Sequence, residues 1–226
     1  MTSGDPTANA ANATAPARRT TPGLRPGLAV VALLGCLAPP AAARVLLTQA
    51  QALELAFPGC EVQRQTLYLT AGQVARAGEL AGEPLRSALV HAYAARCGGR
   101  PAGTAYFDTH PVRTLPETVM VVVDEQGRSA RVEVLSFQEP PDYLPREGWY
   151  AQFRGRPLDD ELRLRRAVRP VTGATLTACA TTDAVRRVLA IDRVAREARA
   201  AQPQPAPAGA RKPPSPGGTA GGSKPR

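Results

Sequence analysis

The stretch "ETVMVVVDEQGRSARVEVLSF", Glu117 to Phe137, carries the clearest structural signal in the chain. Two short runs rich in valine, Val119–Val123 and Arg131–Leu135, flank a polar turn around Asp124–Gly127. Apolar runs of this length, rich in β-branched residues and bounded by turn residues, are typical of β-strands. Strands joined by a tight turn must pair antiparallel. The stretch therefore predicts an antiparallel hairpin.

Upstream of this hairpin the chain predicts more of the same sheet. The segments "LRSALVHAYAAR" and "AGTAYFDTHPVR" flank "CGGR", Cys97 to Arg100, which predicts a second hairpin with Gly98 and Gly99 in its turn. Before it, Glu61–Leu69 alternates in polarity as a half-buried strand does.

Three stretches predict helices. Thr48 with Gln51, and Thr70 with Gln73, have the spacing of capping boxes. The first helix ends at Phe57-Pro58-Gly59 and the second runs to about Leu80. The third is predicted from Thr181 to Ala198, with an apolar face that the arginines Arg186, Arg187, Arg193 and Arg196 avoid. Together these elements predict an α+β fold, an antiparallel sheet of hairpins with packed helices in a single domain at residues 44–200.

The first 43 residues have the pattern of a secretory signal. A basic region is followed by the apolar run Leu28–Ala38 and by a small-residue site at Ala41–Ala43. Cleavage after Ala43 is one interpretation. A second is a lipoprotein signal in which Cys36 becomes the lipidated first residue, and a third is an uncleaved anchor. The apolar run is shorter than the roughly 20 residues that span a bilayer.

The last segment, residues 201–226, is rich in Pro and Gly and has no large apolar side chain, so we expect it to be disordered. The formal net charge of the whole chain is +9, of which this tail carries +4 and residues 1–43 carry +2, which leaves +3 for residues 44–200. A nucleic-acid-binding domain needs a basic face on its folded part. The composition therefore argues against a nucleic-acid partner.

Cysteine and histidine usage limits the chemistry of the domain. Cys60 and Cys97 are candidates for a disulfide, which an exported protein permits; two unpaired buried thiols are the alternative. The chain has two histidines and no cysteine cluster, so no zinc site is expected. His110, which precedes Pro111, is predicted to lie in a loop.

Aromatic residues gather in a segment that several prolines interrupt. Tyr143, Trp149, Tyr150 and Phe153 lie within eleven positions, and the last three have the spacing of one or two helical turns. Such a cluster either packs as a cap on the core or forms a wall for a flat ring. The residues alone leave both readings open.

The stretch "RPVTGATLTACATTDAVRRVLA", Arg169 to Ala190, places five hydroxyl residues around a Gly-Ala pair at the start of a helical pattern. Free amides and the dipole at a helix N-terminus favour an anion, and Gly173 and Ala174 let a bulky group approach the backbone. A phosphate on Thr175 would meet such amides. The alternative is ordinary helix capping by Thr177, Thr181 and Thr182.

Two segments together resemble the FMN-binding domain family. "VTGATLTACATTDAVRRVLA" is similar to its flavinylation segment, and "FQEPPDYLPREGWYAQFRGRPL" is similar to a stretch upstream of it. The family includes the C subunit of the sodium-pumping NADH:quinone oxidoreductase and the G subunit of the Rnf complex. The motifs lie between Val119 and Ala190, in a family-like region of about residues 105–195. Thr172-Gly173-Ala174-Thr175 matches the end of the motif to which a flavin transferase attaches FMN through a phosphoester.

The resemblance implies an exported flavoprotein, periplasmic or on the outer face of the cytoplasmic membrane, that relays electrons and carries FMN on Thr175. Its partners would be membrane redox proteins or a quinone-linked complex, and a flavin transferase for maturation. An electron carrier is favoured over a stand-alone enzyme, because the sequence shows no nucleophile–base pair and no metal motif. The implied cofactor-binding residues are Thr172, Gly173, Ala174, Thr175, Leu176, Thr177, Trp149 and Tyr143.

One position departs from the family's pattern, because Arg169 stands where the family has an acidic residue. This makes covalent attachment a weaker expectation than FMN binding. Arg165, Arg166 and Arg169 either help to hold a phosphate or form a solvated basic turn. Two other functions stay open: an FMN-binding regulatory or assembly module, and a flavin-free interaction domain of the cell envelope.

Overall fold

The computed structural model describes residues 44–201. The expected signal segment with Cys36, and all of the expected disordered tail except Ala201, lie outside the described residues.

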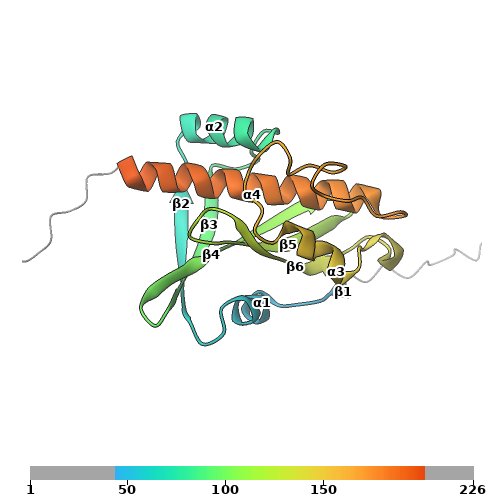
Figure 1. Ribbon diagram of the computed structural model, residues 1–226, viewed down its shortest axis with the longest axis horizontal. Helices are drawn as coiled ribbons and strands as arrows, with labels where there is room; N and C mark the ends of the chain where they lie inside the picture. Colours follow the sequence, from blue (N-terminus) through green and yellow to red (C-terminus); the bar gives the residue numbers. More distant parts are fainter. Residues whose placement is uncertain (1–43, 202–226) are drawn as a thin grey trace, which may run out of the picture. The chain divides into compact units, whose positions relative to one another are not determined.

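The described chain forms one six-stranded antiparallel sheet with helices on both faces (Figure 1). Its strands are β1 (Arg44–Val45), β2 (Glu61–Tyr68), β3 (Leu89–Cys97), β4 (Arg100–Pro111), β5 (Pro116–Val123) and β6 (Ser129–Phe137), in the spatial order β1-β6-β5-β4-β3-β2. The helices are α1 (Gln49–Ala56), α2 (Ala71–Ala81), α3 (Glu147–Tyr150) and α4 (Thr175–Ala201), with short 3₁₀ turns η1 (Pro141–Tyr143) and η2 (Ala151–Phe153). The predicted α+β class and both predicted hairpins are confirmed.

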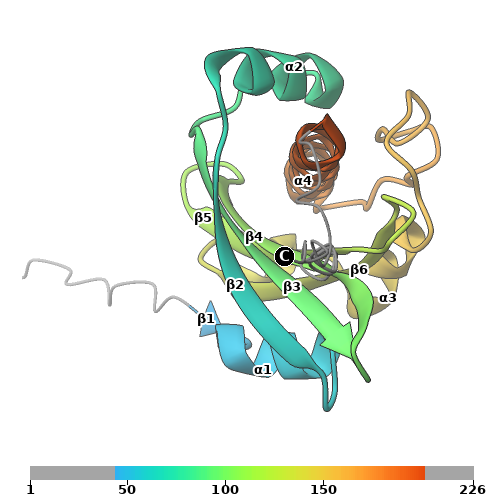
Figure 2. The ribbon, with the colours of Figure 1, turned by 90° about the vertical axis from the view of Figure 1, so that its left-hand side faces the viewer.

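Helix α4 lies along one face of the sheet and α1 lies on the opposite face (Figure 2). Strand β5 is covered on both sides, which explains its unbroken apolar run. Val119, Val121 and Val123 belong to the cluster that packs under α4, whereas Met120 and Val122 belong to the cluster under α1. Successive strand residues point to opposite faces, so a strand inside two layers must be apolar at every position.

Helix α2 forms a further layer on the side of α4 that faces away from the sheet (Figure 2). Small residues of the two helices meet there, among them Ala81 and Ala190. This layer corrects the prediction that Arg186 and Arg187 avoid the buried face, because both side chains are buried. Arg186 donates to the carbonyl oxygens of Ala81 at 3.0 Å and Asp159 at 2.5 Å, which compensates for its burial.

The predicted capping boxes and the candidate disulfide are present, whereas the predicted start of the last helix and the predicted position of His110 are not. Both capping boxes are formed, and Cys60 and Cys97 form a disulfide between the start of β2 and the end of β3. Helix α4, however, begins at Thr175, six residues before the predicted start at Thr181. The expected loop residue His110 lies instead near the end of β4 with a 3% exposed side chain. Its prediction from Pro111 was wrong because a proline is tolerated at a strand end.

Candidate functional site

Helix α4 begins without a side-chain cap. Ala174 occupies the position before its first residue and accepts the bond from the amide of Ala178 at 2.9 Å, yet alanine has no side-chain oxygen to cap the free amides. The amides of Thr175, Leu176 and Thr177 therefore lack intrahelical acceptors. Helices α1 and α2, by contrast, each begin with a threonine that closes a capping box.

The turn in front of α4 leaves Thr175 open to solvent. Gly173 has a φ of +84°, and a Cβ built on it would meet nothing within 4 Å. Ala174 is 3% exposed and fixes the turn to the core, whereas Thr172 and Thr175 are exposed. Thr175 Oγ1 donates to the carbonyl oxygen of Val171 at 3.1 Å. The predicted attachment hydroxyl thus lies on the surface beside an unobstructed stretch of backbone.

The other threonines are not caps, which corrects that alternative. Thr177, Thr181 and Thr182 lie inside α4 and are at most 1% exposed. Thr177 Oγ1 donates to the carbonyl oxygen of Tyr143 at 2.6 Å, and Thr182 Oγ1 donates to that of Ala178 at 2.6 Å. Their hydroxyls fasten the helix to its surroundings, because each buried hydroxyl must find a partner.

The aromatic segment is fixed to the chain that leads to Thr175. Trp149 Nε1 donates to the carbonyl oxygen of Arg169 at 2.7 Å, and the amide of Arg169 donates to Gln152 Oε1 at 2.9 Å. The Trp149 ring makes edge contacts with Tyr150 and Phe153 at centroid distances of 5.1 and 5.3 Å. Tyr150 and Phe153 are buried, whereas Trp149 is half-buried, so part of this cluster packs in the core and part faces outward.

Tyr143 is also half-buried, with the guanidinium of Arg113 5.1 Å from its ring centre. Glu139 holds the loop that carries Arg113, since its Oε1 accepts from the amides of Thr114 at 2.8 Å and Leu115 at 2.9 Å. The structure thus joins Tyr143 to Thr177 directly and joins Trp149 to the backbone six residues before Thr175. It records no direct contact between Trp149 and Thr175 among the described residues.

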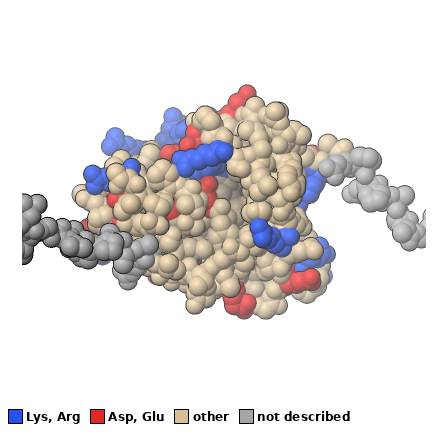
Figure 3. All heavy atoms as spheres, turned by 180° about the vertical axis from the view of Figure 1, so that it is seen from behind, with Lys and Arg blue, Asp and Glu red and all other residues tan. Residues whose placement is uncertain are grey.

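The three arginines before α4 do not all make the same contacts. Arg165, Arg166 and Arg169 are all exposed, and Arg166 pairs with Glu161 at 3.4 Å. Charged side chains of both signs are scattered over the face opposite the view of Figure 1 (Figure 3).

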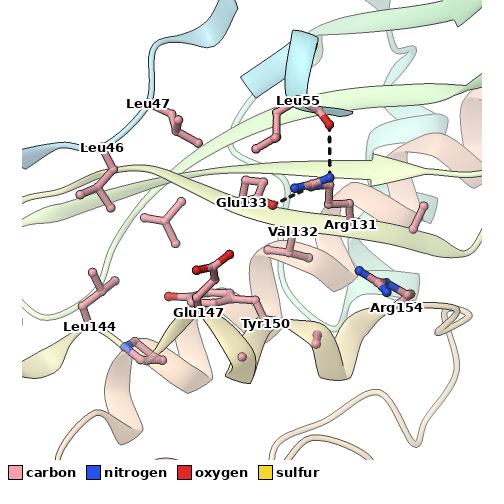
Figure 4. A pocket seen from close by; sticks show the side chains of 15 residues that line it. Leu46, Leu47, Leu55, Arg131, Val132, Glu133, Leu144, Glu147, Tyr150 and Arg154 are labelled. Carbon is pink, nitrogen blue, oxygen red and sulfur yellow. Dashed lines mark hydrogen bonds and ion pairs between the residues drawn. The ribbon is translucent and has the colours of Figure 1, made fainter. Parts of the chain in front are cut away.

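A cleft with a volume of about 600 Å³ lies away from these residues, between β6, α1 and the α3 region (Figure 4). Leu46, Leu47, Leu55 and Leu144 line it together with Tyr150, and its charged groups are Arg131, Glu133, Glu147 and Arg154. On the edge of β6 that faces away from β5, the described residues supply no strand partner between Ser129, which bridges to Arg156, and Leu135, whose carbonyl accepts from Leu46. None of the sequence-predicted site residues lines this cleft.

Sequence reasoning missed a buried ionic cluster under the first half of α4. His110 lies between Asp108 of the same strand, at 2.9 Å, and Glu117 of β5, at 3.1 Å. Arg187 of α4 binds the Asp108 carboxylate through two nitrogens, at 2.7 and 2.8 Å, and pairs with Glu83. The signal available in the sequence was the i, i+2 spacing of Asp108 and His110 in a strand, which puts both side chains on one face.

Comparisons with models of known protein families, and with characterised proteins, find no match for this chain. No helix within residues 44–201 is long and apolar enough to cross a membrane. The same part of the chain contains no group of three or more side chains arranged to hold a metal ion.

Proposed function

We propose that this protein is an exported FMN-binding flavoprotein that relays electrons, with the FMN phosphate joined to Thr175 as a phosphoester. The observation that carries the proposal is the position of Thr175: an exposed hydroxyl on the first turn of a 27-residue helix, after a glycine that leaves the backbone open.

The residues at this turn fit a phosphate. Three amides without intrahelical acceptors lie at the helix start, and the absence of a capping side chain leaves them for an external anion. An anion placed there is stabilised by about 0.3–1 kcal/mol when exposed. The half-buried aromatics Trp149 and Tyr143 offer flat surfaces for a ring; the indole N–H of Trp149 bonds to the Arg169 carbonyl, and the backbone carbonyl of Tyr143 accepts from Thr177 of α4.

FMN supplies one- and two-electron chemistry when it is bound. The residues of this chain contribute binding and orientation: Thr177 fixes Tyr143 and Trp149 fixes the backbone at Arg169. Leu176, next to the attachment residue, is 55% exposed and gives the site an apolar edge for a redox partner. We propose membrane redox proteins or a quinone-linked complex as those partners, and a flavin transferase for maturation.

The Cys60–Cys97 disulfide supports the exported location, because disulfides persist in oxidising compartments. Arg169 departs from the family's acidic residue only in its side chain. Its backbone amide and carbonyl hold Gln152 and Trp149, and any residue supplies those two groups except proline, which lacks the amide. We therefore propose that Arg169 affects recognition by the transferase rather than the shape of the site.

The test is to purify the full chain from a host that exports it and contains a flavin transferase. Visible flavin absorption that survives denaturation, with the FMN mass on the peptide containing Thr175, supports the proposal. Thr175→Ala abolishes this covalent flavin, whereas the matched control Thr172→Ala, an exposed threonine three residues earlier, retains it. Covalent flavin on the Thr175→Ala protein, or FMN mass on another residue, overturns the assignment.

Two other outcomes identify the alternatives. Flavin that is released on denaturation indicates a non-covalent FMN-binding carrier or regulatory module. A colourless protein indicates a flavin-free interaction domain, a function that one observation favours: the apolar cleft along the open edge of β6 (Figure 4). An open strand edge beside apolar pockets is a surface to which an extended peptide can add as a further strand.

A further inference from the structure

The buried cluster under α4 contains several charged side chains that the proposed function does not use. Glu117 is fully buried; its Oε2 accepts from Thr181 Oγ1 at 2.9 Å and lies 3.1 Å from His110 Nε2. His110 Nδ1 lies 2.9 Å from Asp108 Oδ1, and Arg187 holds the same carboxylate. The side chains come from β4, β5 and α4, so the cluster joins the helix to the centre of the sheet.

The geometry sets the number of protons in this cluster. Each ring nitrogen of His110 faces a carboxylate oxygen at hydrogen-bonding distance, and each such contact needs one proton between the two atoms. Burial alone would lower the pKa of His110, but its hydrogen bonds to Asp108 and Glu117 outweigh burial and raise it. A protonated His110 satisfies both contacts, and this is the form that its raised pKa favours.

With His110 protonated, the cluster still holds more negative than positive charges, and one oxygen of Glu117 has no hydrogen-bond donor within residues 44–201. The carboxylates of Glu83, Asp108 and Glu117 face two cations, His110 and Arg187. Asp183 of α4 adds a further acid nearby, whose pKa is raised by burial and by Glu83, and Arg186 adds a further cation beside it. Glu117 Oε1 and the hydroxyl of Tyr150 are buried and have no hydrogen-bond partner among the described residues. The pKa of Tyr150 is raised by burial and by the charge of Glu117, so Tyr150 stays a neutral phenol.

This acceptor lies under the first half of α4, the helix that begins with Thr175. Thr181, which binds Glu117, follows Thr177 by one turn on the same face of α4 and Thr175 by six residues, or about 9 Å of helix rise. Tyr150 packs against Trp149 at 5.1 Å between ring centres. Asp108, whose side chain is 14% exposed, connects the cluster to solvent.

We propose that Glu117 and His110 form a proton-binding site in the core, where Glu117 Oε1 takes up one proton from solvent when a cofactor at the start of α4 is reduced. The inference rests on the proposed function. Two-electron reduction of a bound FMN by a redox protein would add one proton and one net negative charge at the start of α4. The second proton, on Glu117, balances that charge, so two electrons enter together with two protons.

The coupling is electrostatic. A negative charge gained at the start of α4 raises the proton affinity of a buried carboxylate, and the effect is stronger in the low dielectric of the protein interior than in water. A cluster with an excess negative charge and an acceptor without a donor is where an incoming proton is most strongly favoured.

The experiment measures the midpoint potential of the flavin-loaded full chain against pH by spectroelectrochemistry, in wild type and in Glu117→Gln. Glutamine keeps an oxygen for Thr181 but takes up no proton. In the pH range where the reduced protein holds the extra proton and the oxidised protein does not, we expect the wild-type potential to fall with pH more steeply than that of the variant, by up to about 30 mV per pH unit, the limit for one more proton in a two-electron couple. Equal slopes in two flavin-loaded proteins overturn the inference.

The matched control is Asp192→Asn. Asp192 is also a buried carboxylate of α4, bonded to a buried tyrosine, Tyr106, at 2.9 Å, but it lies 17 residues beyond Thr175 along the helix. Its removal leaves the slope unchanged. If both variants reduce the pH dependence of the midpoint potential by the same amount, the effect comes from any buried charge on α4, and the assignment to Glu117 is overturned.

A second measurement covers the case in which Glu117→Gln does not fold. The infrared difference between reduced and oxidised wild-type protein, with isotopically labelled glutamate, shows a new protonated carboxylic acid; its absence overturns the inference. The cofactor-free protein gives an independent check, since NMR shows both ring N–H groups of His110 at neutral pH. A protein that never holds flavin defeats the proposed function and, with it, the coupling, whereas a flavin-loaded protein with equal slopes defeats the coupling alone.

Discussion

Trp149 donates its indole N–H to the backbone carbonyl of Arg169 at 2.7 Å, six residues before the proposed attachment threonine. The bond makes the path of the backbone into α4 independent of the side chain at position 169. It also places the only tryptophan of the chain against the segment that presents Thr175.

Arg169→Asp restores the acidic residue that the family-like motif lacks, and we expect it to increase the fraction of protein that carries covalent FMN. The fold is retained, because only the backbone of residue 169 makes the contacts to Trp149 and Gln152. Intact-protein mass spectrometry measures the loaded fraction. The control is Arg165→Asp, another exposed arginine of the same turn, which leaves that fraction as it is; an equal increase in both variants would point to charge alone.

Trp149 fluorescence reports on the cofactor directly. With FMN bound at the start of α4, we expect strong quenching of the tryptophan emission relative to flavin-free protein. The chain has one tryptophan, so the signal has a single source. Equal emission from the two forms would separate Trp149 from the cofactor and leave it with the role of fixing the Arg169 backbone.

Thr177→Val keeps the shape of the side chain but removes the donor to the Tyr143 carbonyl. A buried acceptor left without its partner costs about 1–3 kcal/mol of unfolding free energy. We expect a fall of that size in urea unfolding, whereas the exposed Thr172→Val changes stability by less than about 0.5 kcal/mol. A Thr177→Val protein as stable as wild type would show that Tyr143 finds another donor.

The His110 cluster predicts how stability depends on pH. The pKa of His110 is raised, so its contribution is fully present below its unfolded value of about 6.5 and is lost as the pH rises through the folded value. In His110→Gln, this loss of stability at alkaline pH is absent. For Asp108, burial would raise the pKa, but hydrogen bonds from Arg187 and His110 lower it to about 2. Its contribution is present above about pH 4 and is lost as the pH falls toward 2. Urea unfolding of the cofactor-free protein at a series of pH values measures both effects. We expect the unfolding free energy of His110→Gln to fall less at alkaline pH than that of wild type, and an equal fall in both proteins would contradict the assignment.

Reduction of the Cys60–Cys97 disulfide, or the double substitution Cys60→Ser with Cys97→Ser, is expected to destabilise the domain by about 3–4 kcal/mol. The residues are 37 apart, and a cross-link over a loop of that length restricts the unfolded chain by this amount. Thermal unfolding with and without reductant measures the loss. The exposed Cys179 serves as the control, since Cys179→Ser leaves the difference unchanged.

Structural elements that depend on residues close together in the sequence were predicted from the sequence. The capping boxes at Thr48 and Thr70 and the hairpin around Asp124–Gly127 follow from short-range patterns, and the structure has all of them. The sequence left the pairing of Cys60 with Cys97 open, and the structure shows the disulfide. The candidate site was also partly readable from short-range patterns. Gly173 lies in the turn that the pattern suggested, whereas Thr175 is the first residue of a helix that was predicted to start at Thr181.

What the sequence could not determine depends on which surfaces meet. Arg186 and Arg187 follow the rule for an exposed helix face, and only the second layer formed by α2 buries them. Thr177 and Thr181 resemble caps because capping and buried side-chain bonding use the same hydroxyl; only the positions of Tyr143 and Glu117 decide between the two. His110 next to a proline resembles a loop residue until β5 and α4 bring Glu117 and Arg187 to it. Short-range hydrogen bonding is thus encoded in neighbouring residues, whereas burial and charge pairing exist only once distant segments have packed together.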